Sequence, residues 1–310
     1  MPVVKQLFLG GYGAGITTLG EDLRPVGHTP FAAPSFLAAH PSLPVLYAVG
    51  EHEEGRLGAF TRSAAGLTPA GERSSGGSLP CHLAVHPSGR LLAVANYGDG
   101  TVSLHRLDER GGFDGEPILL RHEGSGPVAD RQERSHAHQA VFHDDVLHVS
   151  DLGTDEIRRY GLDGRALEPV RLAPGFGPRH FAFDGTTWHV AGELDGTVRA
   201  YDASWLETAR ARASEGQPNH PSHLEVSGGL VYVANRGPDT ISVLRAGSLE
   251  KVAEVPCGGR WPRHFALAGD RLLVANQHSG GVAVLPLEDG IPGKAEHVID
   301  AESPACVLKS

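Results

Sequence analysis

Pro178-Arg179-His180-Phe181 and Pro262-Arg263-His264-Phe265 are two copies of a phrase that occurs seven times along the chain. The phrase opens with a small or turn-forming residue, in most copies continues with a polar residue, and ends in apolar ones. The other five copies begin at Pro34, Pro80, Ala137, Pro221 and Pro304. Successive copies are 46, 57, 41, 43, 41 and 42 residues apart. A period of this size is typical of propellers and solenoids, in which each repeat is one supersecondary unit.

A polar pair ends the apolar run that follows each of the first six phrases. The pairs are Gly50-Glu51, Asn96-Tyr97, Ser150-Asp151, Gly192-Glu193, Asn235-Arg236 and Asn276-Gln277. Runs such as residues 45–49 are aliphatic and too short for a typical helix, which favours buried strands. A turn with Gly or Asp follows the pair, and an alternating stretch such as residues 197–201 follows the turn. The pattern predicts antiparallel strands joined by hairpin turns.

The repeats predict an all-β protein, specifically a seven-bladed β-propeller with four-stranded antiparallel blades. One closed all-β unit can accommodate 310 residues, so residues 1–310 are predicted to form a single domain. Residues 5–9 have no phrase before them, and residues 304–308 are followed only by Lys309 and Ser310. We therefore expect the two ends of the chain to complete one blade together. Residues 205–212 look helical and are expected on the outside.

Composition and charge argue against several classes of protein. The formal net charge is −10, whereas a sequence-independent nucleic-acid binder needs a basic face. Cys81, Cys257 and Cys306 lack CxxC spacing, so they indicate neither a disulfide framework nor a zinc site. The longest uncharged stretch, residues 29–50, contains four prolines and cannot be a membrane-spanning helix. We expect a cytoplasmic protein with no nucleic-acid, membrane or obligate protein partner.

In a propeller blade, the first strand begins and the second strand ends at the same face. The polar residues of the phrases and of the pairs are therefore expected to converge at one mouth of the channel. These residues include Glu51, His82, Tyr97, His138, Asp151, Arg179, His180, Glu193, His223, Arg236, Arg263, His264 and Gln277. The insertion at residues 121–135 ends on this face and is expected to cover part of the mouth.

Side chains of this kind can perform acid–base and oxyanion chemistry. A neutral histidine can take a proton from water near pH 7, and an arginine can hold a carboxylate or phosphate with two hydrogen bonds. His82, His180, His223 and His264 fit a structural role better, since buried polar groups must be paired. Three arginines, Arg179, Arg236 and Arg263, would repel one another without an anion or a glutamate, so they favour a functional role.

Two other arrangements of site residues are not predicted. His136 and His138 form an HxH pair that could bind a metal from one face of a strand, but a third ligand is not evident. Cys81 and His82 could form a nucleophilic pair, but adjacent residues of a strand point to opposite faces. The sequence therefore predicts no metal site and no cofactor.

Several segments together resemble the lactonase family of seven-bladed propellers, which includes the propeller type of 6-phosphogluconolactonase and fungal carboxy-muconate lactonizing enzymes. The segments are residues 133–138 (ERSHAH), 177–181 (GPRHF), 192–194 (GEL), 234–237 (ANRG), 259–265 (GRWPRHF) and 273–277 (LVANQ). The resemblance spans nearly the whole chain. It implies an active centre formed by His138, Arg179, Glu193 and Arg236, with Arg263 in a neighbouring motif.

The residues and the resemblance together predict hydrolysis of an anionic sugar lactone, most simply 6-phosphogluconolactone. His138 would activate water, Arg179 and Arg236 would bind the anion and the developing oxyanion, and Glu193 would orient them. The predicted substrate-binding residues are His82, Tyr97, His136, Arg263, His264 and Gln277. Two alternatives stay open at this point, a lactonizing isomerase of the muconate type and a non-catalytic propeller that serves as a binding scaffold.

Overall fold

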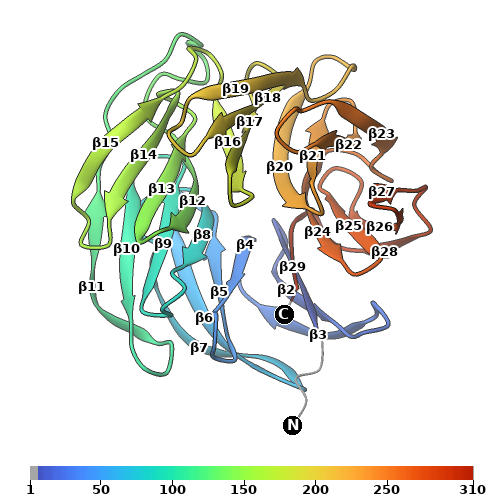
Figure 1. Cartoon of the computed structure of the whole chain (residues 1–310). Coiled ribbons are helices and arrows are strands. Elements are labelled where there is room, and N and C mark those ends of the chain that lie inside the picture. Colours follow the sequence, from blue (N-terminus) through green and yellow to red (C-terminus); the bar gives the residue numbers. More distant parts are fainter. Residues whose placement is uncertain (1–5, 310) are drawn as a thin grey trace. The chain divides into compact units, whose positions relative to one another are not determined.

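The computed structural model describes residues 6–309, which form 29 strands and no helix. The chain divides into two compact units. The first contains residues up to Pro169 together with the stretch from Cys306 onward, and the second contains Val170–Ala305. Every sheet in both units is built from consecutive antiparallel strands, apart from the one that joins the two ends of the chain (Figure 1).

The first unit holds four four-stranded sheets. One sheet contains β29 (Pro304–Lys309), β1 (Leu7–Gly11), β2 (Gly15–Leu19) and β3 (Pro25–Pro30), in that order. The next contains β4 (Pro34–Ala39), β5 (Val45–Gly50), β6 (Arg56–Ser63) and β7 (Gly66–Ser74). The third contains β8 (Pro80–Val85), β9 (Leu91–Asn96), β10 (Val102–Leu107) and β11 (Phe113–Leu120). The fourth contains β12 (Ala137–His143), β13 (Val146–Asp151), β14 (Glu156–Gly161) and β15 (Ala166–Arg171).

The second unit holds three sheets. One contains β16 (Pro178–Phe183), β17 (Thr187–Gly192), β18 (Thr197–Asp202) and β19 (Glu207–Arg212). The next contains β20 (His220–Ser227), β21 (Leu230–Arg236), β22 (Thr240–Arg245) and β23 (Lys251–Pro256). The last contains β24 (Pro262–Ala268), β25 (Arg271–Asn276), β26 (Gly281–Glu288) and β27 (Ile291–Pro292), and β28 (His297–Asp300) also pairs with β26.

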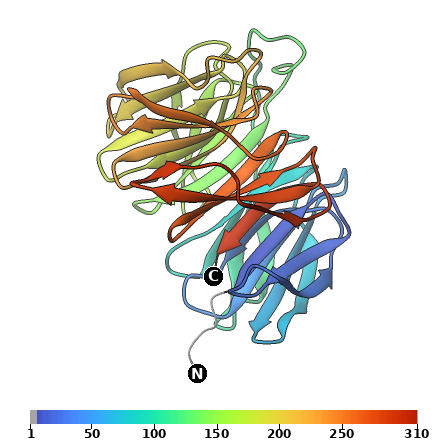
Figure 2. The same ribbon diagram turned by 90° about the vertical axis from the view of Figure 1, so that its right-hand side faces the viewer.

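The sheet that joins the two chain ends confirms the predicted closure. β29 is hydrogen-bonded to β1 and forms one edge of this sheet, and Figure 2 shows the C-terminal strand among the N-terminal ones. Cys306 packs with Phe8 and Ile16 in one hydrophobic cluster. The predicted N-terminal strand at residues 5–9 is observed as β1, and its first residue, Lys5, lies outside the described residues.

The prediction of a helix at residues 205–212 is wrong. Residues 207–212 form β19, which pairs with β18 through Val198 and Ala211. The carboxylate of Asp202 accepts hydrogen bonds from the backbone N–H groups of Ser204 and Leu206, and this bonding sets a turn rather than a helix. A helix of this length is not stable by itself, so pairing with the sheet prevails.

The second strand of a sheet is buried on both faces. In β5, Tyr47 and Val49 pack in a cluster with Leu92 of β9, whereas Leu46 and Ala48 pack in a different cluster with Phe8. A strand covered on both sides favours apolar residues at successive positions. This explains the continuous aliphatic runs that appear in the sequence once per repeat.

A β-bulge follows the start of the first strand in six sheets. Each bulge adds one residue to this strand, and the strands are β4, β8, β12, β16, β20 and β24. The opening residue of the phrase still pairs with the end of the next strand, as Pro178 does with Gly192 and Pro262 with Asn276. Phrase and polar pair therefore lie at the same end of each of these six sheets, as predicted. A bulge re-aims side chains, and here it falls on the polar residues of the phrase.

Candidate active site

Arg179, Glu193 and Arg236 form a buried ionic cluster in the second unit. Arg179 lies in the bulge of β16, and Glu193 follows β17, where its N–H donates to the carbonyl of Gly177 at 2.9 Å. This backbone bond holds Glu193 beside the start of β16. Arg236 is the last residue of β21 in the adjoining sheet, and its Nε donates to the carbonyl of His220 at 3.0 Å.

Both arginines contact the same carboxylate oxygen. Arg179 Nε lies 2.9 Å and Arg236 Nη2 lies 2.6 Å from Oε2 of Glu193. The three residues are at most 5% exposed to solvent. Arginine keeps its charge in proteins, so with Glu193 ionised this cluster has two positive charges and one negative charge. Charges that have lost most of their water are stabilised by a partner, and the excess positive charge suits an anionic ligand.

Arg263 and Gln277 lie at the corresponding end of the last sheet of this unit. Arg263 occupies the bulge of β24, and Gln277 follows β25. The N–H of Gln277 donates to the carbonyl of Trp261 at 3.1 Å. Its side-chain Oε1 is buried, and no hydrogen-bond partner for it is present among residues 6–309. An acceptor of this kind is suited to a hydroxyl group of a ligand.

Three histidines of the second unit contact one another across its sheets. His180 and His223 share a hydrogen bond between their Nδ1 atoms at 2.8 Å, and the rings of His223 and His264 stack at 3.9 Å. Burial, and to a smaller extent the charge of Arg179, lower the pKa of His223 to about 3. Burial also lowers the pKa of His264. These contacts agree with the structural role that the sequence favoured for these histidines.

His138 is the predicted base and lies in the first unit, in the bulge of β12. The sulfur of Cys81 lies 3.7 Å from its Nδ1 and 3.3 Å from its backbone carbonyl oxygen. A thiol that donates to this carbonyl can accept from the Nδ1–H of the imidazole, and Nε2 is then the basic nitrogen. Sequence reasoning considered Cys81 only beside His82, rejected that pair, and missed the contact with His138. Cys81 and His138 come into contact because both lie in bulges of neighbouring sheets.

Tyr97 links the two histidines of the HxH pair. Its ring stacks on His136 at 4.5 Å and meets His138 edge-on at 5.4 Å. His136 Nδ1 lies 2.8 Å from the carbonyl oxygen of Tyr97, and Nε2 lies 3.2 Å from Oε1 of Glu133. His136 precedes β12 and a bulge follows it, so the rule that places residues i and i+2 on one face does not apply. Within residues 6–309, no group of three or more His, Cys, Asp or Glu could hold a metal.

His82 packs between sheets of the first unit. Its ring lies 4.0 Å from that of Phe36, and its Nδ1 accepts from the N–H of Ala140 at 3.4 Å. The side chain is 6% exposed. These contacts are those of a histidine that joins neighbouring sheets.

A buried polar network supports the insertion that precedes His138. Asp151 accepts from the hydroxyl of Ser135 at 2.6 Å and from the N–H of His136 at 2.8 Å, and it lies beside His122. Burial opposes ionisation of Asp151, but these partners outweigh it and lower its pKa. His122 in turn contacts the hydroxyl of Tyr160, whose pKa is raised by burial to about 12. Asp151 therefore fixes the backbone at Ser135 and His136, just before His138.

The structure brings the predicted residues together in two groups. His136, His138 and Tyr97 are in contact in the first unit, and Arg179, Glu193 and Arg236 are in contact in the second. That both groups act on one substrate stays a prediction.

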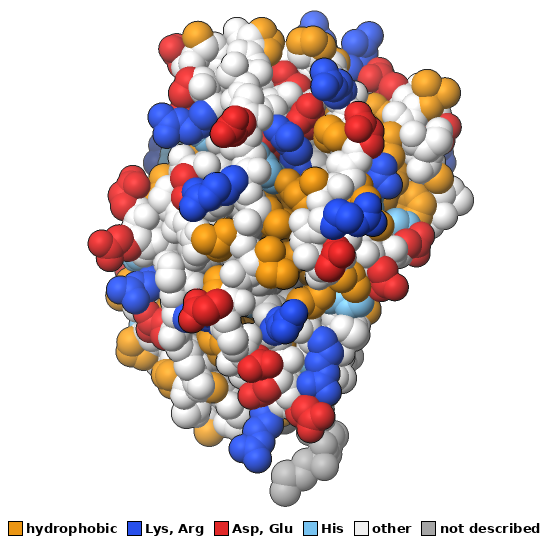
Figure 3. All heavy atoms as spheres, turned by 90° about the vertical axis from the view of Figure 1, so that its left-hand side faces the viewer, with side chains coloured by type: hydrophobic (Ala, Val, Ile, Leu, Met, Phe, Trp, Pro, Cys, Tyr) orange, Lys and Arg blue, Asp and Glu red, His pale blue; other side chains and the backbone are white. Residues whose placement is uncertain are grey.

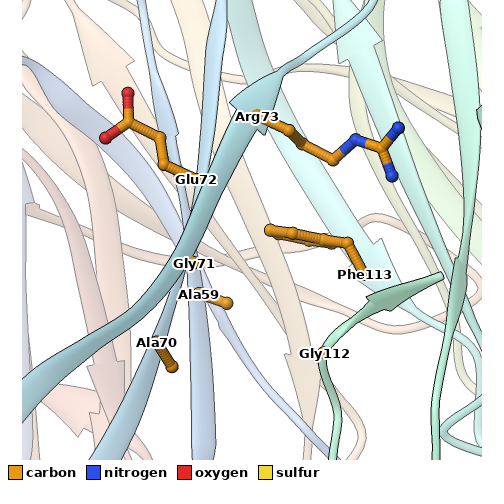
Figure 4. Close-up of a pocket in the computed structure, with 7 residues that line it drawn as sticks. All are labelled: Ala59, Ala70, Gly71, Glu72, Arg73, Gly112 and Phe113. Atoms are coloured by element: carbon orange, nitrogen blue, oxygen red, sulfur yellow. The ribbon is translucent and has the colours of Figure 1, made fainter.

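A pocket of about 380 Å³ in the first unit contains none of these residues. It lies beside β7 and the start of β11, where the guanidinium of Arg73 extends over the ring of Phe113 (Figure 4). Arg73 is engaged by the carbonyl of Gly115 at 2.9 Å. This pocket is therefore distinct from the candidate active-site residues.

The surface shown in Figure 3 has acidic and basic side chains interspersed, and neither sign of charge dominates it. A continuous basic face of the kind that binds nucleic acid is not seen in this view. Among residues 6–309 no helix is long and apolar enough to span a membrane.

Comparison with known proteins identifies the family of this chain. Residues 14–309 match the family described as Lactonase, 7-bladed beta-propeller. The chain belongs to this family. The predicted family and the predicted fold, a seven-bladed β-propeller with one blade completed by both chain ends, are thereby confirmed.

The matches to named relatives cover most of the chain. A 6-phosphogluconolactonase of Formosa agariphila is 31% identical over 81% of this chain and 80% of its own length. A 6-phosphogluconolactonase of Bacillus subtilis is 30% identical over 88% of this chain and 86% of its own length. A crystal structure of a candidate 6-phosphogluconolactonase from Bacteroides uniformis has a TM-score of 0.92 and 26% identity, and the match covers 99% of each chain.

Proposed function

We propose that this lactone hydrolase acts on an anionic sugar lactone, most simply 6-phosphogluconolactone, and forms 6-phosphogluconate without a cofactor. The observation that carries the proposal is the buried cluster of Arg179, Glu193 and Arg236, in which two guanidinium groups share one carboxylate oxygen. Two relatives that are named 6-phosphogluconolactonase and are at least 30% identical support the same substrate.

The arginines provide the binding energy for the anion. A buried guanidinium binds phosphate or carboxylate through charge-assisted hydrogen bonds, which are about twice as strong as neutral ones. Glu193 keeps the two guanidinium groups from repelling each other in the free protein. When a negative oxygen develops during attack on the lactone carbonyl, the same groups stabilise it without rearranging. Gln277 and Arg263 supply further polar contacts for the sugar.

His138 is the general base of the proposed reaction. Its Nε2 takes a proton from water, and the hydroxide adds to the lactone carbonyl carbon to give a tetrahedral alkoxide. The ring C–O bond then breaks as the carbonyl re-forms, and His138 returns its proton to the departing ring oxygen. The product is the open-chain hydroxy acid, and the histidine ends in its starting state.

Assays with a small panel of lactones test this proposal. The panel contains 6-phosphogluconolactone, uncharged gluconolactone and a muconolactone, each measured with and without EDTA. We expect the phosphorylated lactone to have the highest kcat/KM and EDTA to have no effect. Preference for the muconolactone would indicate a lactonizing isomerase, and loss of turnover in EDTA that added metal restores would indicate a metal-dependent enzyme. Turnover of none of the three would indicate a binding scaffold.

A further inference from the structure

Trp261 stands at a backbone position that the fold imposes. It precedes Pro262 and has a left-handed backbone with φ of 63°. The residue before the phrase is also left-handed in four other repeats, at Ala33, Leu79, Gly177 and Ser303. Small and aliphatic residues therefore satisfy this position elsewhere in the chain. A bulky left-handed residue is strained, so the indole at this position needs an explanation other than the fold.

The backbone of Trp261 is held from both sides. Its N–H donates to Oδ1 of Asp239 at 2.7 Å, and its carbonyl accepts from the N–H of Gln277 at 3.1 Å. Asp239 lies in the turn between β21 and β22, the strand pair that carries Arg236. These two bonds fix the indole relative to the end of β21.

The indole lies against the guanidinium of Arg236. Cζ of Arg236 is over the ring, 5.4 Å from its centroid. The ring is also stacked on His278, with centroids 4.9 Å apart and planes inclined by 13°. A cation over an aromatic face is attracted by the ring's quadrupole, most strongly by that of tryptophan. Trp261 therefore contacts the face of a guanidinium whose edge is bonded to His220 and Glu193.

We propose that Trp261 is a positioning residue that holds the guanidinium plane of Arg236 for an anionic substrate. The inference rests on the proposed function, because it assigns Arg236 to anion binding. The carbonyl of His220 and the carboxylate of Glu193 fix the edge of the guanidinium, and the indole restricts its tilt. An arginine held on three sides loses little conformational freedom when an anion binds, and preorganisation of this kind increases affinity.

Kinetic measurements of Trp261→Leu and Trp261→Phe test the proposal. Leucine is compatible with the backbone, since Leu79 occupies the same position before Pro80. We expect kcat/KM for 6-phosphogluconolactone to fall roughly tenfold in Trp261→Leu and roughly threefold in Trp261→Phe, since a phenyl ring keeps part of the attraction. The loss should appear mainly in KM, because the contact acts on binding.

Trp205→Leu is the matched control. Trp205 is also left-handed, with φ of 66°, and its ring stacks on Trp188 at 4.7 Å. Trp205→Leu therefore removes a stacked indole from the same unit, and none of the contacts described above joins Trp205 to Arg236. We expect its kcat/KM to stay within twofold of wild type. Equal losses in Trp205→Leu and Trp261→Leu would overturn the proposal.

A double mutant separates positioning from any other role. If Trp261 acts through Arg236, adding Trp261→Leu to Arg236→Ala should change kcat/KM by no more than about twofold, because coupled residues are not additive. A further tenfold loss in the double mutant would overturn the proposal.

A fluorescence measurement is independent of turnover. The chain has three tryptophans, so Trp188→Phe combined with Trp205→Phe leaves Trp261 as the single emitter. We expect its emission to change when Arg236→Ala is added, and to change on titration with inorganic phosphate only while Arg236 is present. Emission insensitive to Arg236→Ala would refute the contact. A change with Arg236→Ala but no turnover of any lactone would instead reject the proposed function and leave the positioning contact in place.

Discussion

Replacing Glu193 by Gln removes the one negative charge between two buried arginines and leaves a side chain of nearly the same shape. Removing one partner of a buried ion pair costs roughly 3–5 kcal/mol, because the remaining charge is left uncompensated. Here two guanidinium groups, at 2.9 and 2.6 Å, depend on the same oxygen. We therefore expect the free energy of unfolding to fall by an amount near the upper end of that range. The free energy of unfolding of a typical domain is roughly 5–15 kcal/mol. The variant should therefore still fold.

The same change should lower kcat by roughly a hundredfold or more, the scale of a lost catalytic group. Urea denaturation of wild type and variant at pH 7.5 measures stability, and 6-phosphogluconolactone turnover measures kcat. Phosphate supplies a discriminating control. Two unpaired guanidinium groups should bind it more tightly than the paired cluster, so added phosphate should stabilise Glu193→Gln more than wild type.

Two outcomes contradict this reasoning. If the variant keeps both its stability and its turnover, the short contacts of Glu193 contribute nothing and the cluster is not the anion site. If stability falls but kcat stays unchanged, Glu193 has only a structural role. Phosphate that stabilises both proteins equally would show that the anion binds elsewhere.

Three further predictions follow from the described contacts. His138→Ala should lower kcat by roughly two or more powers of ten with little change in melting temperature, and a variant that loses stability while it keeps turnover would assign His138 a structural role. Arg236→Ala should lower kcat/KM for 6-phosphogluconolactone by an amount equivalent to roughly 2–5 kcal/mol, and kcat/KM for gluconolactone by less. Both substrates are measured at one ionic strength. Equal losses would mean that the arginine does not bind the phosphate. Stability should decrease as pH falls from about 6.5 towards 4, because the folded-state pKa of His105 and of His148 is lowered to about 4 and that of His223 to about 3, mainly by burial. At these three positions the unfolded chain binds protons in this range and the folded chain does not, so each of these histidines lowers the free energy of unfolding by up to about 1.4 kcal/mol per pH unit. Urea midpoints at pH 7, 6 and 5 measure this slope, and His105→Gln should reduce it.

Much of the fold was predictable because the repeat spacing and the apolar runs arise from burial on both faces of each second strand. The helix expected at residues 205–212 was not correct, since the sequence pattern of a short exposed edge strand such as β19 is dominated by surface residues. The pairing of Arg179 with Glu193 was foreseeable, because phrase and polar pair meet at the end of one sheet. The contact between Cys81 and His138 was not, because it depends on bulges that no periodicity reveals.

The bulges also affect how readily the candidate active site can change. A residue in a bulge has no opposite partner in the ladder, so its side chain can be exchanged with little effect on strand pairing. In the six sheets with a bulge, the second position of the phrase is occupied by Ser35, Cys81, His138, Arg179, Ser222 and Arg263. Hydroxyl, thiol, imidazole and guanidinium groups thus occur at equivalent places on one scaffold. Directed evolution of new substrate specificity should therefore begin with these positions, where new chemistry can be introduced separately from the sheets that carry it.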